Sequence, residues 1–149
     1  MIALIQRVSA ARVQIDGAVV GQIGPGLVAL IGVVRGDDTG CARRLLARVL
    51  DYRVFPDAQQ RMNLSLRAHG GGLLLVPQFT LAADTHSGTR PGFSTAAAPA
   101  EAQALFDELL ALAAAAHSPV AAGRFGAHMQ VSLTNDGPVT FWLEAAPPG

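Results

Sequence analysis

The chain has 149 residues, half of them hydrophobic, so it can form one core but is too short for a catalytic domain plus a substantial second domain. Its 11 basic and 11 acidic residues balance, which excludes the strong positive field of a non-specific nucleic-acid binder. All the basic residues are arginine, which excludes lysine Schiff-base chemistry and a P-loop. Only 15% of the residues are charged, so we expect a partner to cover part of the surface.

The first third of the chain predicts an antiparallel meander followed by a helix. Apolar runs separated by turn signals indicate strands at 2–8, 12–15, 18–23 and 27–34, and Asp16-Gly17 is a strong hairpin signal between two of them. The oxygens of Asp37, Asp38 and Thr39 can cap a helix that continues to residue 50. Its apolar residues share one stripe, so we expect this helix to lie on the sheet.

The rest of the chain predicts two more strands, a long loop, a second helix and a final strand pair. We expect strands at 52–55 and 73–76, irregular structure at 61–72, a surface loop at 83–94 and a helix at 99–117. Strands at 129–133 and 139–143 are joined by a link too short for a crossover, which predicts an antiparallel pair. Two helices cannot cover both faces of so many strands. The predicted fold is therefore a single α/β domain, with a curved, barrel-like, largely antiparallel sheet and two main helices on one side.

Side-chain catalytic machinery is hard to find in this sequence. Cys41 is the only cysteine, which excludes an intrachain disulfide and a cysteine cluster for zinc and favours a reducing cytoplasm. The four histidines lack metal-ligand spacing, and no serine lies in a nucleophile-elbow context. No apolar run reaches membrane-spanning length. We therefore expect no metal, no cofactor and no membrane association.

Two segments depart from ordinary structural patterns. In Pro77-Gln78-Phe79-Thr80-Leu81 a buried strand runs into a proline and then into polar residues, which either frees backbone N–H groups or simply ends the strand. The second segment is Asn135-Asp136-Gly137-Pro138-Val139-Thr140. It can be a hairpin turn, or Gly137-Pro138 can be cis and aim two carbonyls at an ammonium group.

With these segments included, the sequence resembles the D-aminoacyl-tRNA deacylase family, also called D-tyrosyl-tRNA deacylases, over nearly its whole length. The similarity rests on an ordered set of strings rather than on any single one. They are Met1-Ile2-Ala3-Leu4-Ile5-Gln6-Arg7-Val8, Arg53-Val54-Phe55, Met62-Asn63-Leu64, Gln78-Phe79-Thr80-Leu81-Ala82, Arg90-Pro91 with Phe93, Gly123-Arg124-Phe125, Met129-Gln130-Val131, and the segment from Asn135 to Thr140.

The resemblance implies an enzyme that hydrolyses the ester of D-aminoacyl-tRNA, and also of glycyl-tRNA mischarged on tRNA-Ala, as chiral proofreading in the cytoplasm. It implies a homodimer in which a cis Gly137-Pro138 enters the partner's site and excludes L-amino acids. Backbone at Phe79 and Thr80, with Gln78, would receive the oxyanion, and a 2′-hydroxyl of the tRNA would assist. Such a mechanism needs no side-chain base. The partner is the aminoacyl-tRNA 3′ end, and no DNA is expected.

The remaining residue roles come from the same resemblance. Phe125 and Met129 would line the pocket for the terminal adenosine, although both also suit a core, and Arg7 would support the Gly-Pro loop. Pro77 stands where the family commonly has serine, so a mechanism that depends on that serine is excluded here. Gly92 likewise replaces a frequent serine.

Two other hypotheses remain open at this stage. Thr80 could be a covalent nucleophile, although no general base is visible near it in the sequence. The chain could also be a non-catalytic module that binds single-stranded ends, but the neutral charge and few aromatic residues argue against this class.

Overall fold

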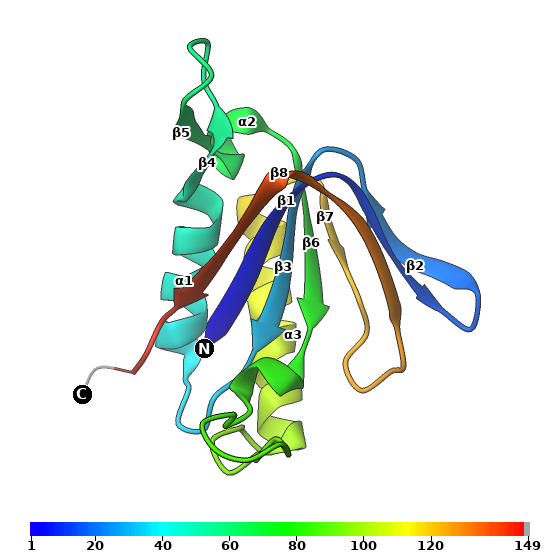
Figure 1. The fold of residues 1–149 in the computed structure, drawn as a ribbon, viewed down its shortest axis with the longest axis vertical. Helices are drawn as coiled ribbons and strands as arrows, with labels where there is room; N and C mark the ends of the chain where they lie inside the picture. Colours follow the sequence, from blue (N-terminus) through cyan, green and yellow to red (C-terminus); the bar gives the residue numbers. More distant parts are fainter. Residues whose placement is uncertain (148–149) are drawn as a thin grey trace.

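A strongly bent sheet organises the computed structural model, which describes residues 1–147 (Figure 1). Three α-helices and one 3-10 helix accompany eight strands in this part of the chain. In chain order the elements are β1 (Ile2–Ile15), β2 (Ala18–Ile23), β3 (Gly26–Gly32), α1 (Thr39–Asp51), β4 (Arg53–Pro56), β5 (Met62–Ser65), α2 (Leu66–His69), β6 (Gly72–Pro77), η1 (Phe79–Ala82), α3 (Pro99–Ala116), β7 (Val120–Ala122) and β8 (Gln130–Glu144).

The long strand β1 is the centre of the main sheet. Along one side it pairs antiparallel with β3 and then with β2, and along the other side it pairs antiparallel with β8 over nearly its whole length. Strands β3, β6 and β7 continue the sheet in parallel. The sheet then curls until β2 approaches β7, where a Cβ on Gly21 would lie 2.7 Å from the Ala122 carbonyl oxygen. The predicted barrel-like α/β fold is confirmed, with two parallel pairings in the sheet.

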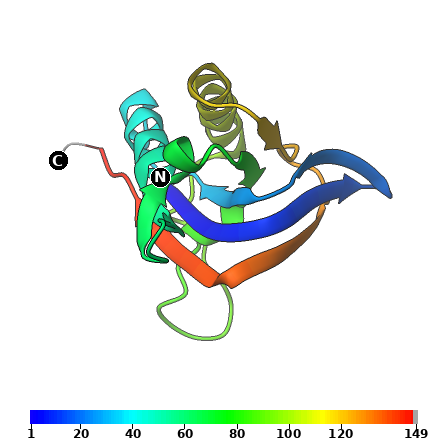
Figure 2. The ribbon, with the colours of Figure 1, turned by 90° about the horizontal axis from the view of Figure 1, so that it is seen from above.

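Both long helices lie on one side of the sheet, as predicted (Figure 2). Helix α1 starts where the Asp38 carboxylate accepts a hydrogen bond of 3.0 Å from the Cys41 N–H. Its apolar stripe, which includes Leu45 and Val49, is fully buried in a cluster that also contains Phe106 and Leu109 of α3. This cluster fixes the helices against β1, β3 and β6.

A second, smaller core fills the inside of the curled sheet. It contains Val13, Ile23, Val28 and Val76 among its buried residues. Strand β1 serves both cores, because its first half directs Ile5 toward the helices and its second half directs Val13 into the curl. Register shifts on either side of Val8 in the pairing with β8 mark the change of face.

Three predictions about local structure are wrong, and one short strand was not predicted. The residues predicted as strands at 129–133 and 139–143 are not a hairpin pair; they are two halves of β8, because both pair with the same long strand β1. Residues 2–8 and 12–15 are likewise one strand. Residues 61–72 are not irregular, since Ser65 caps the short helix α2 and β5 pairs with β4. Strand β7 was not predicted, because three residues carry too little periodicity.

None of the helices within residues 1–147 is both long enough and apolar enough to cross a membrane.

Candidate active site

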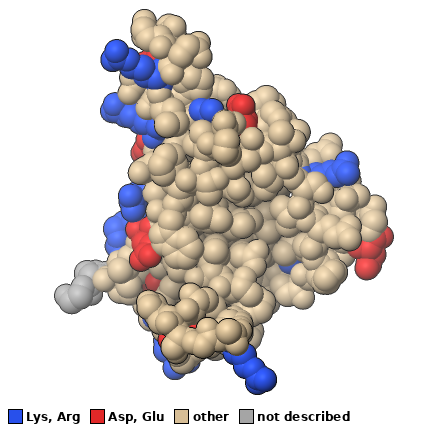
Figure 3. Space-filling view, viewed as in Figure 1, with Lys and Arg blue, Asp and Glu red and all other residues tan. Residues whose placement is uncertain are grey.

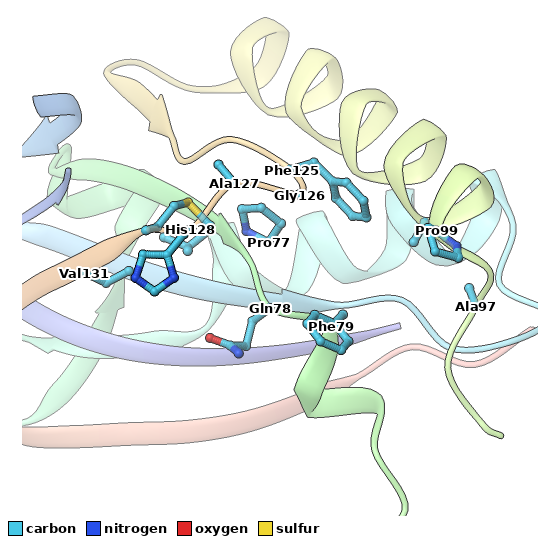
Figure 4. Close-up of a pocket in the computed structure, with 13 residues that line it drawn as sticks. Pro77, Gln78, Phe79, Ala97, Pro99, Phe125, Gly126, Ala127, His128 and Val131 are labelled. Carbon is cyan, nitrogen blue, oxygen red and sulfur yellow. The ribbon is translucent and has the colours of Figure 1, made fainter. Parts of the chain in front are cut away.

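A pocket opens where strand β6 ends and η1 begins (Figure 4). Its volume is about 450 Å³, a size suited to a nucleoside or a small drug-like ligand. Figure 4 shows that Phe125 and Phe79 reach the pocket from different segments and that Pro99 bounds it at the start of α3. The lining residues are Val76, Pro77, Gln78, Phe79, Ala97, Pro99, Ala102, Phe125, Gly126, Ala127, His128, Met129 and Val131.

The pocket wall is apolar and soft. Phe125 and Met129 are half-buried and contribute an aromatic ring and a thioether, both of which pack well against the face of a planar ring. The lining contains no Asp, Glu or Arg, and His128 is its one titratable residue. Such a pocket can hold a flat, uncharged group such as a nucleobase.

The polar edge of the pocket is the start of η1. The Gln78 N–H still belongs to the sheet, because it donates to the Ile31 carbonyl at 2.8 Å. Phe79 and Thr80 form the first turn of η1, where N–H groups have no partner inside a helix, and no side chain caps this turn. The Gln78 side-chain amide donates to the Thr80 hydroxyl, which orients both side chains. The N–H groups of Phe79 and Thr80 therefore have no hydrogen-bond partner within residues 1–147, and Phe79 lines the cavity.

Phe79 is the most exposed large apolar residue described. The residue is 61% exposed, and the centroid of its ring lies 5.3 Å from the ring centroid of Phe93 in the loop that follows η1. In the same loop the hydrogen bonds that Asp84 accepts from His86 lower the pKa of that carboxyl. Phe79 and Phe93 together form an apolar ridge at the mouth of the pocket. The described part of the chain leaves this ridge exposed.

The segment Asp136–Val139 protrudes from the sheet. Gln6 pairs with Thr140 and Val8 pairs with Asn135, so four residues of β8 stand opposite the single residue Arg7. The peptide bond between Gly137 and Pro138 is cis, and Gly137 has a φ of +142°, where side chains are rarely accommodated.

Arg7 and Asn135 hold this protrusion in place. The Arg7 guanidinium donates to the Asp136 carbonyl at 2.9 Å and to the Val54 carbonyl of β4 at 2.7 Å. The Asn135 side chain accepts from the Val139 N–H and donates to Thr140, both at 2.8 Å. Arg7 therefore contacts the protrusion at Asp136, and Gly137 and Pro138 themselves are exposed.

The residues predicted for the site fall into two groups in one chain. Gln78, Phe79, Phe125 and Met129 line the pocket, and Thr80 follows them on η1. Gly137, Pro138 and Arg7 do not line it; Arg7 contacts β4 through the Val54 carbonyl. His128, the pocket's titratable residue, and the wall from Ala97 to Ala102 were missed, because residues distant in sequence meet there only after folding. Within residues 1–147 no group of three or more His, Cys, Asp or Glu residues is placed to hold a metal ion.

Comparison with known proteins identifies the family. The family described as D-Tyr-tRNA(Tyr) deacylase matches residues 4–144. This chain belongs to that family. The D-aminoacyl-tRNA deacylase of Thioalkalivibrio sulfidiphilus is 65% identical over 148 residues, covering 99% of both chains. The enzyme of the same name from Alkalilimnicola ehrlichii is 65% identical over 147 residues, covering 99% of this chain and 98% of its own.

A solved structure gives the same fold. A protein described as c-Myc DNA Unwinding Element Binding Protein superposes with a TM-score of 0.94 at 32% identity, covering 99% of this chain and all of its own. The barrel-like sheet described above is therefore shared with this solved structure.

Proposed function

We propose that this chain is a D-aminoacyl-tRNA deacylase whose active site is the pocket between η1 and Met129, completed by Gly137-Pro138 of a second copy. One observation carries the proposal: an apolar pocket sized for a nucleoside has unpaired backbone donors at its edge. Gly137, Pro138 and Arg7, which the family resemblance also assigns to the site, do not line this pocket. The enzyme class itself is supported by the family match over residues 4–144.

The terminal adenosine fits the pocket by its chemistry. Its base is flat and uncharged, and it can stack on Phe125 and pack against Met129. The aminoacyl ester on the ribose then lies toward η1, where the N–H groups of Phe79 and Thr80 can donate to the carbonyl oxygen.

The reaction is an ester hydrolysis. A water oxygen bonds to the carbonyl carbon, and the resulting oxyanion accepts hydrogen bonds from the backbone donors of η1. The bond from the carbonyl carbon to the ribose 3′ oxygen then breaks, and a proton moves to that oxygen. The products are a free amino acid and tRNA with its 3′-hydroxyl restored. We propose that the adjacent 2′-hydroxyl assists the proton transfer, since the pocket offers no carboxylate base.

A second copy of the chain would supply the chiral filter. The exposed Gly137-Pro138 protrusion does not line its own chain's pocket, so we propose that it acts on the pocket of a second copy. Unburied apolar side chains are available for the contact: Phe79 and Phe93 flank the pocket, and Trp142 of the edge strand β8 is 49% exposed. Carbonyl groups of the protrusion would accept from the substrate's α-ammonium and leave no room for an L side chain. Glycine lacks a side chain, so glycyl-tRNA mischarged on tRNA-Ala is a further proposed substrate of this proofreading enzyme in the cytoplasm.

Matched substrates test the activity. Purified protein is incubated with D-tyrosyl-tRNA and L-tyrosyl-tRNA, and loss of the ester is followed. We expect rapid hydrolysis of the D-ester only. Equal rates, or no hydrolysis of the D-ester, would refute the proposal.

Filling the pocket tests its location. Ala127→Trp places an indole in the cavity and should abolish hydrolysis, while Ala114→Trp adds the same group to an exposed position of α3 and should not. Sedimentation of the unmodified protein should show a dimer. If Ala127→Trp is folded and fully active, the pocket is not the active site.

A further inference from the structure

The charge of this neutral chain is segregated along the sequence. Six of the 11 arginines but only two acidic residues lie between positions 43 and 67, a net charge of 6 − 2 = +4. The remaining residues carry five arginines and nine acidic residues, a net charge of 5 − 9 = −4. The six are Arg43, Arg44, Arg48, Arg53, Arg61 and Arg67, which we call the arginine face, and all six are exposed.

The arginine face follows one edge of the molecule. Figure 3 shows basic side chains gathered along the edge formed by α1 and the β4–β5 hairpin. Internal contacts leave its charge largely available: Arg67 pairs with Asp51 at 2.9 Å, whereas Arg44 and Arg48 donate to neutral backbone carbonyls. Arg43 and Arg61 form no side-chain hydrogen bond or ion pair within residues 1–147.

Helix α3 has the opposite character. It carries Glu101, Asp107 and Glu108 and no basic residue, and its first turn borders the pocket. The carboxylates of α3 therefore disfavour a path along this helix for a polyanion whose end lies in the pocket.

The protrusion connects the arginine face to the proposed active site. The Arg7 guanidinium donates hydrogen bonds to both the Asp136 carbonyl and the Val54 carbonyl of β4. Strand β4 begins at Arg53, and Arg61 lies between β4 and β5. If Gly137-Pro138 enters the pocket of a second copy, as proposed above, the β4–β5 hairpin is carried to the mouth of the same pocket. We propose that the arginine face binds the phosphodiester backbone of the tRNA acceptor stem whose 3′ end lies in the partner subunit's pocket.

This inference rests on the proposed function. Two substrates distinguish a failure of the inference from a failure of the proposed function. D-tyrosyl-tRNA has the stem, whereas 3′-O-(D-tyrosyl)adenosine presents the same ester without it. The variant Arg43→Gln/Arg61→Gln removes two charges from the arginine face, and Arg12→Gln/Arg35→Gln removes two exposed charges elsewhere as a matched control.

We expect only the first variant to raise KM for the tRNA, with kcat unchanged and with wild-type activity on the adenosine ester. Each phosphate contact contributes about 0.9 to the slope of log affinity against log salt, so a change from 50 to 200 mM NaCl should weaken wild-type kcat/KM about tenfold more than that of the variant. Arg43→Lys/Arg61→Lys keeps the charge and should restore most of the salt dependence.

Each other outcome has a distinct meaning. If the wild type hydrolyses neither ester, the proposed function fails and this inference with it. If the wild type hydrolyses both and the Arg43→Gln/Arg61→Gln variant keeps its KM and salt dependence on tRNA, only the inference is overturned; a face that binds protein instead would give this result. Activity on the adenosine ester shows in the same experiment that the variant is folded.

Mixed dimers test whether the arginines act on the partner's pocket. One subunit carries Ala127→Trp and intact arginines, and the other carries an open pocket with Arg43→Gln/Arg61→Gln. We expect wild-type KM for tRNA at the single open pocket, because its partner supplies the arginines. The KM of the fully substituted dimer would show instead that the arginines serve their own subunit, and would overturn the proposed arrangement.

Discussion

Gly137→Ala is the substitution that tests the proposed chiral filter most directly. Gly137 has a φ of +142°, and a Cβ added there would lie 2.6 Å from Val139 Cγ2 and 3.3 Å from an Arg7 guanidinium nitrogen. An L residue forced into such a conformation costs about 1–3 kcal/mol. If the protrusion must keep its shape to accept the substrate's ammonium, the same energy lowers kcat/KM for D-tyrosyl-tRNA about 5- to 150-fold.

The assay needs a control for the backbone cost alone. Gly17→Ala also forces an L residue into a positive φ, here +79°, and so carries the backbone cost. Nothing lies within 4 Å of the new Cβ at this hairpin turn, so no steric contact is added. Both variants should lose stability in thermal unfolding, and only Gly137→Ala should lose activity or gain hydrolysis of L-tyrosyl-tRNA. If Gly137→Ala retains kcat/KM within about threefold and the same D to L ratio, the filter does not depend on this loop.

Three further predictions concern single groups. Thr80→Ala should retain substantial hydrolysis of D-tyrosyl-tRNA, because only the Thr80 N–H is assigned to the oxyanion. Complete loss of hydrolysis in a folded variant would favour a covalent threonine nucleophile. Hydrogen bonds from Asn63 and nearby backbone N–H groups lower the pKa of Asp57, so its stabilisation of the β4–β5 hairpin is complete above the ordinary carboxyl pKa and is lost as the pH falls through the lowered value. The Arg61 amide shift, followed by NMR, should therefore titrate with a midpoint below 3.8, and a midpoint at or above it would contradict this. Burial raises the pKa of the Cys41 thiol, so a thiol reagent at pH 8 should react only after unfolding; rapid labelling of the folded protein would show that α1 opens.

Local signals in the sequence predicted the elements that local physics controls. The stripe of Leu45 and Val49 and the cap at Asp38 were enough to place α1, and the apolar run before Pro77 placed β6. The turn signal at Asp136-Gly137-Pro138 led to the wrong prediction of a hairpin pair. Such a signal does not reveal whether the flanking strands pair with each other or with a third strand. Here the unbroken β1 offers partners on both sides of the protrusion, and tertiary pairing overrides the local preference.

The site was predictable only through the family resemblance. Composition and spacing left Phe125 and Met129 open as core residues, and they left the segment after Pro77 open as a plain strand end. The pocket depends on where the segment before β8 crosses the end of β6 and the start of α3, which no local pattern specifies. His128 could not be assigned to the pocket for the same reason, since nothing near it in the sequence indicates a cavity.

The pairing of β1 with β8 also has a consequence for folding. Ile2 and Glu144 are register partners, so the central strand of the sheet is synthesised before the other described strands, and β8 is the last of its neighbours to follow. Until then one edge of β1 carries unpaired backbone groups, a template for pairing with other chains. Contacts of such long sequence separation form slowly. We therefore expect refolding in the range of milliseconds to seconds, with aggregation rising with protein concentration while this edge is open.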